Sequence, residues 1–316
     1  MVNGKLRDTR IVFMGTPEFA VGTLSALVEN GYNVAAVITA PDKPAGRGMQ
    51  LQASAVKQYA ESQSIKVLQP TKLRDEAFLE ELKKLNADLF IVVAFRMLPE
   101  VVWRMPRLGT FNLHASLLPS YRGAAPINWA IINGETETGV TTFFLNEEID
   151  AGKILLQEKV EILPADNAET LHDKLMAVGR RLVLKTVDGI VDSSITPAVQ
   201  ESGKISEAPK LFKENTRIDW QKPAHELVNF VRGLSPYPAA WCELLVDEKP
   251  TMVKIFAAHV EASPADQTAI FNDGKSLKLP CGGGSCLCID KVQLTGKKRM
   301  KAEDFLRGFR GEISLQ

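Results

Sequence analysis

The stretch IVFMGTPE at residues 11–18 decides how this chain of 316 residues begins to fold. Its four consecutive apolar residues predict a buried strand that ends at Gly15. Thr16 is a typical helix N-cap residue, Pro17 suits the first helical position, and Glu18 favours the first helical turn. A strand that leads directly into a helix indicates the first unit of an α/β fold.

The same alternation of strands and helices continues through the first half of the chain. Apolar runs without polar interruptions are typical of strands in a parallel sheet that helices cover on both faces. The predicted strands cover residues 34–39, 88–95, 109–114, 140–145 and 154–160, and the predicted helices cover residues 54–62, 75–85 and 171–182. The first half is therefore predicted to be a Rossmann-like domain with a mostly parallel sheet.

The composition changes near residue 190. Residues 191–208 combine Ser, Pro, Gly and acidic side chains, which predicts a linker. One helical segment at 223–233 is followed by five short strands separated by turns, at 241–246, 252–260, 268–271, 276–279 and 286–292. This pattern indicates a small OB-like β-barrel. We predict a catalytic domain at residues 1–190, a linker at 191–208 and a barrel domain at 209–316.

Charge and apolar patterning restrict the class of protein. The 38 basic residues balance the 38 acidic ones, which argues against a chain whose whole surface binds nucleic acid or an anionic membrane. The longest apolar runs are about seven residues, far short of the ~20 that span a bilayer. The start of the chain lacks a secretory pattern, and four cysteines are too few for a disulfide-built fold. We expect a cytoplasmic protein that is not associated with a membrane.

The stretch NLHASLLP at residues 112–119 carries the first candidate site. At a strand end, the spacing of two places Asn112 and His114 on one face. Open α/β sheets bind ligands at the carboxyl ends of their strands. An amide donor beside an imidazole suits the stabilisation of an oxyanion during acyl transfer. The alternative is a pair of polar residues that merely decorate the strand end.

Two loops supply further candidates. Asp150 lies in the polar loop NEEIDAG at residues 146–152, where its carboxylate could orient an imidazole or transfer protons. The alternative is an ordinary turn aspartate. Residues 39–48 form a long Pro/Gly-rich connection, in which Arg47 could bind an anion. A flexible surface loop is equally consistent with that composition.

These motifs together resemble the folate-dependent formyltransferases, and the resemblance covers essentially the whole chain. The matching motifs include FMGTPEF at 13–19, NLHASLLP at 112–119 and RGAAPI at 122–127, and the Asn-x-His and Ser-Leu-Leu-Pro core of 112–119 is shared by all folate-dependent formyltransferases. Four motifs resemble the branch that acts on methionyl-tRNA: PDKPAGRG at 41–48, IDW at 218–220, SPYPAAW at 235–241 and GKKRM at 296–300.

The resemblance implies a specific reaction. The formyl donor would be 10-formyltetrahydrofolate, and the acceptor would be the α-amine of methionine esterified to initiator tRNA. Asn112, His114 and Asp150 would be the catalytic residues. The folate-binding residues would be Phe95, Met97, Leu98, Ser116, Leu117, Leu118, Pro119 and Asn146, and the tRNA-binding residues would be Lys43, Arg47, Lys297, Lys298 and Arg299.

We expect no metal site, no dinucleotide cofactor and no obligate protein partner. Cys281, Cys286 and Cys288 lack a Cys-x-x-Cys pair and are interpreted as strand-end thiols, and His259 as a surface histidine. Two alternatives to the proposed reaction stay open. One is a formyltransferase acting on an amino-sugar nucleotide, and the other is a non-catalytic RNA-binding protein with a degenerate formyltransferase domain.

Overall fold

The chain forms two compact units, each built from more than one segment. The computed structural model describes residues 8–45, 50–201, 205–246, 248–261, 270–272, 275–307 and 313–315. The N-terminal unit comprises residues 1–123, 138–160 and 172–207, and the C-terminal unit comprises residues 124–137, 161–171 and 208–316. The predicted boundaries, which divide the chain into contiguous pieces, stay a prediction.

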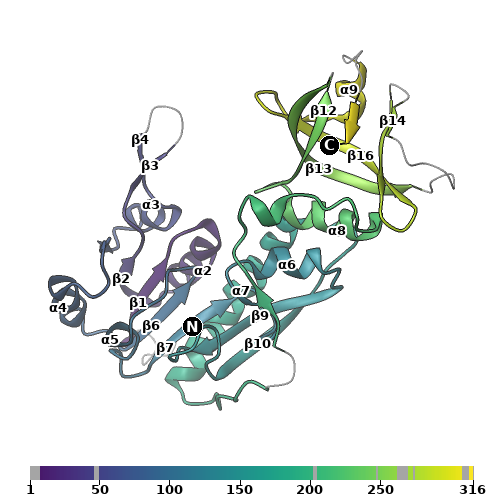
Figure 1. The fold of residues 1–316 in the computed structure, drawn as a ribbon. Coiled ribbons are helices and arrows are strands. Elements are labelled where there is room, and N and C mark those ends of the chain that lie inside the picture. Colours follow the sequence, from purple (N-terminus) through teal and green to yellow (C-terminus); the bar gives the residue numbers. More distant parts are fainter. Residues whose placement is uncertain are drawn as a thin grey trace. The chain divides into compact units, whose positions relative to one another are not determined.

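The N-terminal unit is built on a seven-stranded sheet of order β10-β9-β7-β6-β1-β2-β5 (Figure 1). Strands β5, β2, β1, β6 and β7 run parallel, and β9 pairs with β7 in the antiparallel direction. The strands are β1 (Arg10–Gly15), β2 (Asn33–Ile38), β5 (Val67–Leu68), β6 (Leu89–Val93), β7 (Thr110–His114), β9 (Glu137–Phe144) and β10 (Ile154–Glu161). This confirms the predicted Rossmann-like, mostly parallel sheet, in which every residue of β6 is buried.

Local sequence signals explain where the helices begin. Ser54 and Asp75 cap α3 and α4 by accepting hydrogen bonds from backbone N–H groups three residues later. Pro17, not Thr16, occupies the N-cap position of α2, one residue later than predicted, and its carbonyl accepts from Ala20 and Val21. The helices associated with this sheet are α2 (Glu18–Glu29), α3 (Ala55–Ser62), α4 (Glu76–Lys84), α5 (Glu100–Trp103) and α7 (Ala168–Val191). Two short strands, β3 (Lys43–Ala45) and β4 (Gln50–Gln52), pair where the sequence predicts only a loop.

The strand order creates a place for a ligand at the carboxyl ends of β1 and β6. The chain passes from β1 to β2 on one side and later returns to β6 on the other, so β1 and β6 flank a topological switch point. Gly15 ends β1 there, and a Cβ atom at this position would lie 2.6 Å from the Ala20 Cβ and 2.9 Å from the Val93 carbonyl oxygen. Only glycine permits this close approach.

The C-terminal unit contains an antiparallel sheet that curls into a half-barrel, with the order β14-β15-β16-β13-β12-β18 and with β17 paired to β16. Its core combines apolar residues of the strands with Leu227, Val231 and Leu234 of α8. The strands are β12 (Ala240–Val246), β13 (Lys249–Glu261), β14 (Phe271–Asn272), β15 (Leu277–Cys281), β16 (Ser285–Leu294), β17 (Met300–Lys301) and β18 (Ile313–Leu315). The remaining elements of the described chain are β8 (Arg122–Gly123), which belongs to the N-terminal unit, α6 (Pro126–Ile132), β11 (Glu207–Ala208), the 3-10 helix η1 (Glu214–Thr216), α8 (Ala224–Leu234) and α9 (Ala302–Arg307).

The predicted fold class is therefore confirmed for both parts. The helix expected at 223–233 is α8, and β13 begins three residues earlier than the strand expected at 252–260 and continues past a register shift near Ala257 to Glu261. The strand expected at 268–271 lies partly outside the described residues. In the described part of the chain, no helix is long and apolar enough to cross a membrane.

Candidate active site

His114 is the last residue of β7 and lies almost completely buried. Its Nε2 atom is 2.8 Å from the carbonyl oxygen of Tyr121. Because a carbonyl oxygen only accepts hydrogen bonds, we assign the ring proton to Nε2, which leaves Nδ1 as the unprotonated nitrogen of the neutral ring. Nδ1 lies 3.8 Å from Oδ2 of Asp150, within ion-pair distance but beyond a hydrogen bond. The fold thus brings together two of the predicted catalytic residues.

The loop around Asp150 is fixed by contacts with several segments. Oδ2 of Asp150 accepts a hydrogen bond from the backbone N–H of Gly123 at 2.9 Å. The amide of Gln200 donates to the carbonyl oxygens of Asp150 and Gly152, both at 2.8 Å. A Cβ atom at Gly152 would lie 1.6 Å from the carbonyl oxygen of Phe144, so only glycine fits there. Asp150 itself has a positive φ of 52°, which aspartate tolerates better than most residues.

Asn112 completes the predicted trio. It precedes His114 by two residues on β7, so strand alternation places both side chains on the same face. It is half-buried, and within the described residues no hydrogen bond occupies its amide group. The amide is therefore available to a bound molecule beside the imidazole.

The segment after β7 is held against β9 beside His114. Thr141 is paired with His114 in the sheet register. Its hydroxyl donates to the Ser116 carbonyl at 2.7 Å and accepts from the Leu118 N–H at 3.1 Å. The amide of Gln157 donates to the Leu118 carbonyl at 2.9 Å. These contacts fix the backbone of four predicted folate-binding residues: Ser116, Leu117, Leu118 and Pro119.

Two of the other predicted folate-binding residues, Phe95 and Leu98, meet at a shared apolar cluster. Leu98 is buried within that cluster, and Phe95 and Leu145 pack against it from two different loops. Met97 is 71% exposed. Asn146, which follows Leu145, accepts a hydrogen bond from the Glu148 N–H through its side chain. The structure thus joins the 95–98 segment to the start of the loop that carries Asp150.

Most of this chain matches one protein family. Residues 9–187 match the family described as formyl transferase, and residues 210–310 match its C-terminal domain. The methionyl-tRNA formyltransferases of Bacteroides thetaiotaomicron and Parabacteroides distasonis are 57% and 58% identical to this chain, and each match covers 97% of both proteins. The chain belongs to the methionyl-tRNA formyltransferase family. The resemblance inferred from the sequence motifs is confirmed.

Solved structures support the fold of this formyltransferase. The sugar 3N-formyl transferase WlaRD, studied in the presence of dTDP and 5-N-formyl-THF, matches with a TM-score of 0.65 at 20% identity over 92% of this chain and 99% of its own. HypX from Aquifex aeolicus, in complex with tetrahydrofolic acid, matches with a TM-score of 0.63 at 18% identity over 96% of this chain and 48% of its own. At these identities the likeness concerns the fold alone.

A pocket of about 340 Å³ lies at the switch point of this formyltransferase. It is bordered by loops that follow four neighbouring strands, which is where the strand order predicts a ligand. Its polar border includes Lys43 and Arg96, and the Arg96 guanidinium is held by the carbonyl oxygens of Pro70 and Thr71. The remaining lining residues are Thr16, Ala40, Pro41, Thr71 and Phe95.

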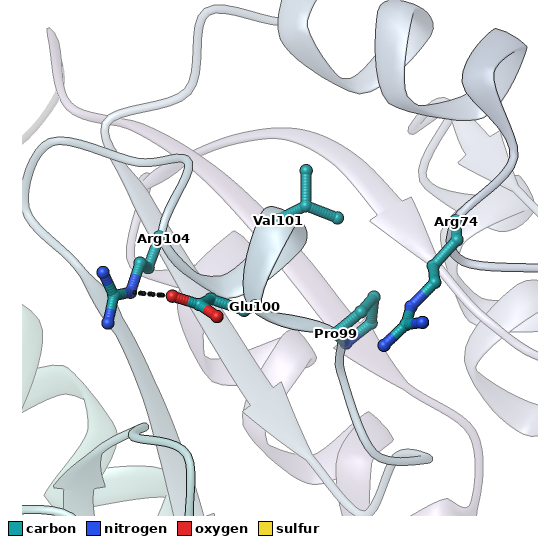
Figure 2. Close-up of a pocket in the computed structure, with 5 residues that line it drawn as sticks. All are labelled: Arg74, Pro99, Glu100, Val101 and Arg104. Atoms are coloured by element: carbon teal, nitrogen blue, oxygen red, sulfur yellow. Dashed lines mark ion pairs between the residues drawn. The ribbon is translucent and has the colours of Figure 1, made fainter.

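A second pocket of about 450 Å³ surrounds the short helix α5 (Figure 2). Figure 2 shows the Glu100 carboxylate turned toward Arg104, with Nε and Oε1 2.9 Å apart, while Arg74 lies on the far side of Pro99. Nη2 of Arg104 also lies 3.2 Å from Oε1 of Glu147, which belongs to the loop that carries Asp150. No residue of this pocket is predicted from the sequence.

The predicted tRNA-binding residues lie in two separate places. Lys43 is exposed on β3, and Arg47 lies outside the described residues. Lys297, Lys298 and Arg299 are exposed between β16 and β17, where the guanidinium carbon of Arg299 stacks 3.6 Å from the centroid of the Phe256 ring. This cation–π contact holds the Arg299 guanidinium over the face of the Phe256 ring. The N–H groups at the edge of the guanidinium can still donate hydrogen bonds.

Several residues that shape the site escape sequence-based prediction. Tyr121 contributes only a backbone carbonyl oxygen, which leaves no side-chain signature. Gln200 lies in the predicted linker, far from His114 in sequence, and Thr141 lies inside an apolar strand. A buried threonine such as Thr141 indicates a site residue only once the strand pairing that places it opposite His114 is known.

Proposed function

We propose that this enzyme transfers the formyl group of 10-formyltetrahydrofolate to the α-amine of methionyl initiator tRNA. The observation that carries the proposal is the identity of 50–58% to methionyl-tRNA formyltransferases over at least 96% of the chain. The imidazole of His114, which lies 3.8 Å from the Asp150 carboxylate, supplies a group that can transfer the proton in this reaction.

The residues near His114 suit a folate. A pterin and its aromatic linker need apolar surface together with a few directed polar groups. Phe95, Leu117 and Pro119 offer half-buried apolar surface, and Asn112 and Asn146 offer amide groups. Leu98 and Leu118 are buried, so we propose that they support the pocket wall from behind.

The proposed reaction begins with the free α-amine, which an ordinary pKa near ~8 makes available at neutral pH. Its nitrogen attacks the formyl carbon, a C–N bond forms, and the carbonyl oxygen becomes an oxyanion. The amide of Asn112 donates a hydrogen bond to that oxyanion. Such a donor typically contributes ~2.7–4 kcal/mol to lowering the barrier.

The hydrogen bonding of His114 determines how we assign the proton transfer. With Nε2–H engaged by Tyr121, Nδ1 offers a lone pair that accepts a proton from the attacking nitrogen. The Asp150 carboxylate, 3.8 Å away, stabilises the positive charge that then forms on the ring. The proton passes to the folate nitrogen as its bond to the formyl carbon breaks and the carbonyl re-forms. Once protonated, Nδ1 can also donate to the oxyanion.

The decisive experiment measures formyl transfer from 10-formyltetrahydrofolate to charged initiator tRNA, with an amino-sugar nucleotide as competitor. We expect formylmethionyl-tRNA as the product and no formylated sugar. Asn112→Ala and His114→Ala should each lose at least about tenfold in turnover while remaining folded. The exposed His225→Ala is the matched control and should keep its turnover. A formylated sugar, or no formyl product with either acceptor, would overturn the proposal in favour of one of the two alternatives.

A further inference from the structure

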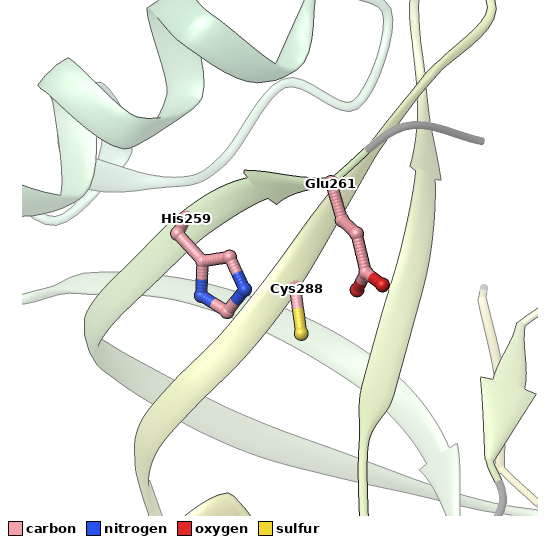
Figure 3. A group of neighbouring side chains, drawn as sticks. All are labelled: His259, Glu261 and Cys288. Carbon is pink, nitrogen blue, oxygen red and sulfur yellow. The ribbon is translucent and has the colours of Figure 1, made fainter.

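The half-barrel carries a second cluster of chemically active side chains. Its members are His259 and Glu261 of β13 and Cys288 of β16 (Figure 3). The strand register places His259 directly opposite Cys288, and the spacing of two places Glu261 on the same face as His259. The three potential ligand atoms all lie within 4.8 Å of one another.

A carboxylate orients the imidazole of this cluster. Nδ1 of His259 is 3.0 Å from both carboxylate oxygens of Asp290, so Nδ1 carries the ring proton and donates it. Figure 3 shows the other ring nitrogen turned toward Cys288 and Glu261. A histidine that binds a metal through one nitrogen and donates to a carboxylate through the other has the arrangement usual at protein metal sites.

We propose that His259, Glu261 and Cys288 bind a divalent transition-metal ion of the zinc type. Imidazole, thiolate and carboxylate are the ligands that Zn²⁺ takes, and three of them leave a fourth position for water. Zinc bond lengths of about 2.0–2.3 Å place tetrahedral ligand atoms about 3.3–3.8 Å apart. The ligand atoms of the cluster lie no more than 4.8 Å apart, and the exposed His259 and half-buried Glu261 can reach zinc distances by small rotations.

The charges around the cluster favour a cation. Glu261 and Asp290 supply two negative charges, and Lys278, whose Nζ lies 2.8 Å from Oε1 of Glu261, supplies one positive charge. The neutral thiol and imidazole leave a net charge of minus one, which becomes minus two when Cys288 binds a metal as the thiolate. Lys278 competes for Glu261, so its ammonium group limits the affinity.

The first test titrates the full-length, untagged, chelator-treated protein with ZnCl2 in a calorimeter. We expect saturable binding of one equivalent, with an affinity at least tenfold weaker in Cys288→Ser and in His259→Ala. Cys281→Ser removes a half-buried thiol that lies outside the cluster and should bind zinc like the wild type. Because His259 is exposed, its replacement leaves the core intact and keeps the test valid if Cys288→Ser misfolds.

The second test uses CoCl2 and absorbance spectroscopy. A thiolate-to-cobalt charge-transfer band should appear with the wild type and with Cys281→Ser, and should be absent with Cys288→Ser. Lys278→Met should bind zinc several-fold more tightly because it removes the competing cation. No saturable zinc binding, or equal affinities for the wild type and both cluster variants, would overturn the proposal. Formyl transfer should be unchanged in His259→Ala, which separates this result from the proposed activity.

Discussion

The two units each hold a histidine beside a carboxylate, and the closer pair is the more exposed one. His114 and Asp150 are 3.8 Å apart, with side chains 7% and 15% exposed, whereas His259 and Asp290 are 3.0 Å apart, with side chains 55% and 45% exposed. An exposed ion pair contributes little, because water screens it and ordering the side chains costs entropy. The buried pair is instead positioned by backbone groups of Tyr121 and Gly123. Distance alone therefore does not distinguish the pair that we propose as catalytic from an exposed ion pair.

The same two pairs differ in which nitrogen faces the acid. At His114 the proton lies on Nε2, and the unprotonated Nδ1 faces Asp150. At His259 the protonated Nδ1 faces Asp290, and the unprotonated Nε2 is left for another ligand. The first arrangement suits proton transfer and the second suits metal binding. A histidine beside an aspartate thus supports two kinds of chemistry, depending on which other groups contact the imidazole ring.

The largest expected effect separates the two histidines directly. His114→Ala should lower kcat for formyl transfer by about 100- to 1,000-fold, since it removes both the proton acceptor and a contact to the oxyanion. His259→Ala should stay within about twofold of the wild type. Steady-state kinetics with charged initiator tRNA measures both, and circular dichroism checks that each variant is folded. Similar losses in the two variants would contradict the assignment of the catalytic pair.

A smaller effect is expected from the carboxylate partners. Asp150→Asn keeps an acceptor for the Gly123 N–H and a side chain that tolerates positive φ, but it removes the charge that stabilises the protonated ring. We expect kcat to fall by about 10- to 100-fold, toward the lower end of what a proton-transfer group contributes. The matched change Asp290→Asn should leave kcat unaltered. If Asp150→Asn retained full turnover, the carboxylate would have only a structural role.

The sequence predicts the side chains of the candidate site but not the backbone groups that orient them. Asn112, His114 and Asp150 stand out because polar residues interrupt apolar strands or follow them, and the strand periodicity places the first two on one face. The backbone groups that orient them, such as the Tyr121 carbonyl, have no side-chain pattern to detect. The cluster of His259, Glu261 and Cys288 could not be predicted from the sequence for another reason. Its ligands are separated along the chain and meet only through the register of β13 with β16, whereas sequence spacing reveals metal sites whose ligands lie close together.

Gln200 offers a test of how the buried pair is positioned. Gln200→Leu removes two hydrogen bonds to the Asp150 loop and the acceptor for Arg122. Each such bond has a net value of about 0.5–1.5 kcal/mol, so we expect kcat to fall by roughly three- to tenfold. The KM for 10-formyltetrahydrofolate should change less than kcat, because the loop is displaced without losing its apolar contacts. A change in KM alone would indicate that Gln200 shapes the binding pocket and does not position Asp150.

The smallest effect should come from an ion pair that is shorter than either histidine pair. Lys57 lies 2.6 Å from Asp42, which precedes the β3–β4 hairpin, and Gln69 donates to the same carboxylate at 2.7 Å. The hydrogen bonds from Lys57 and Gln69 lower the pKa of Asp42 below its ordinary value. A depressed folded-state pKa stabilises the protein above the unfolded-state value and ceases to do so as the pH falls through the folded-state value. Asp42→Asn should therefore lower the Tm slightly at pH 7, and the difference should shrink below the ordinary carboxyl value near pH ~4 and disappear below the depressed pKa of Asp42.

Thermal unfolding at several pH values checks this, with Glu161→Gln as a control at an exposed carboxylate at the end of β10. A drop in Tm as large at low pH as at pH 7 would mean that Asp42 acts through packing and not through its charge. A large drop in Tm at pH 7 would contradict the comparison in a different way, since a short, half-buried ion pair would then stabilise the protein strongly. The small effect follows from partial exposure, because solvent around the Asp42 carboxylate competes with Lys57 and Gln69 for the same oxygens.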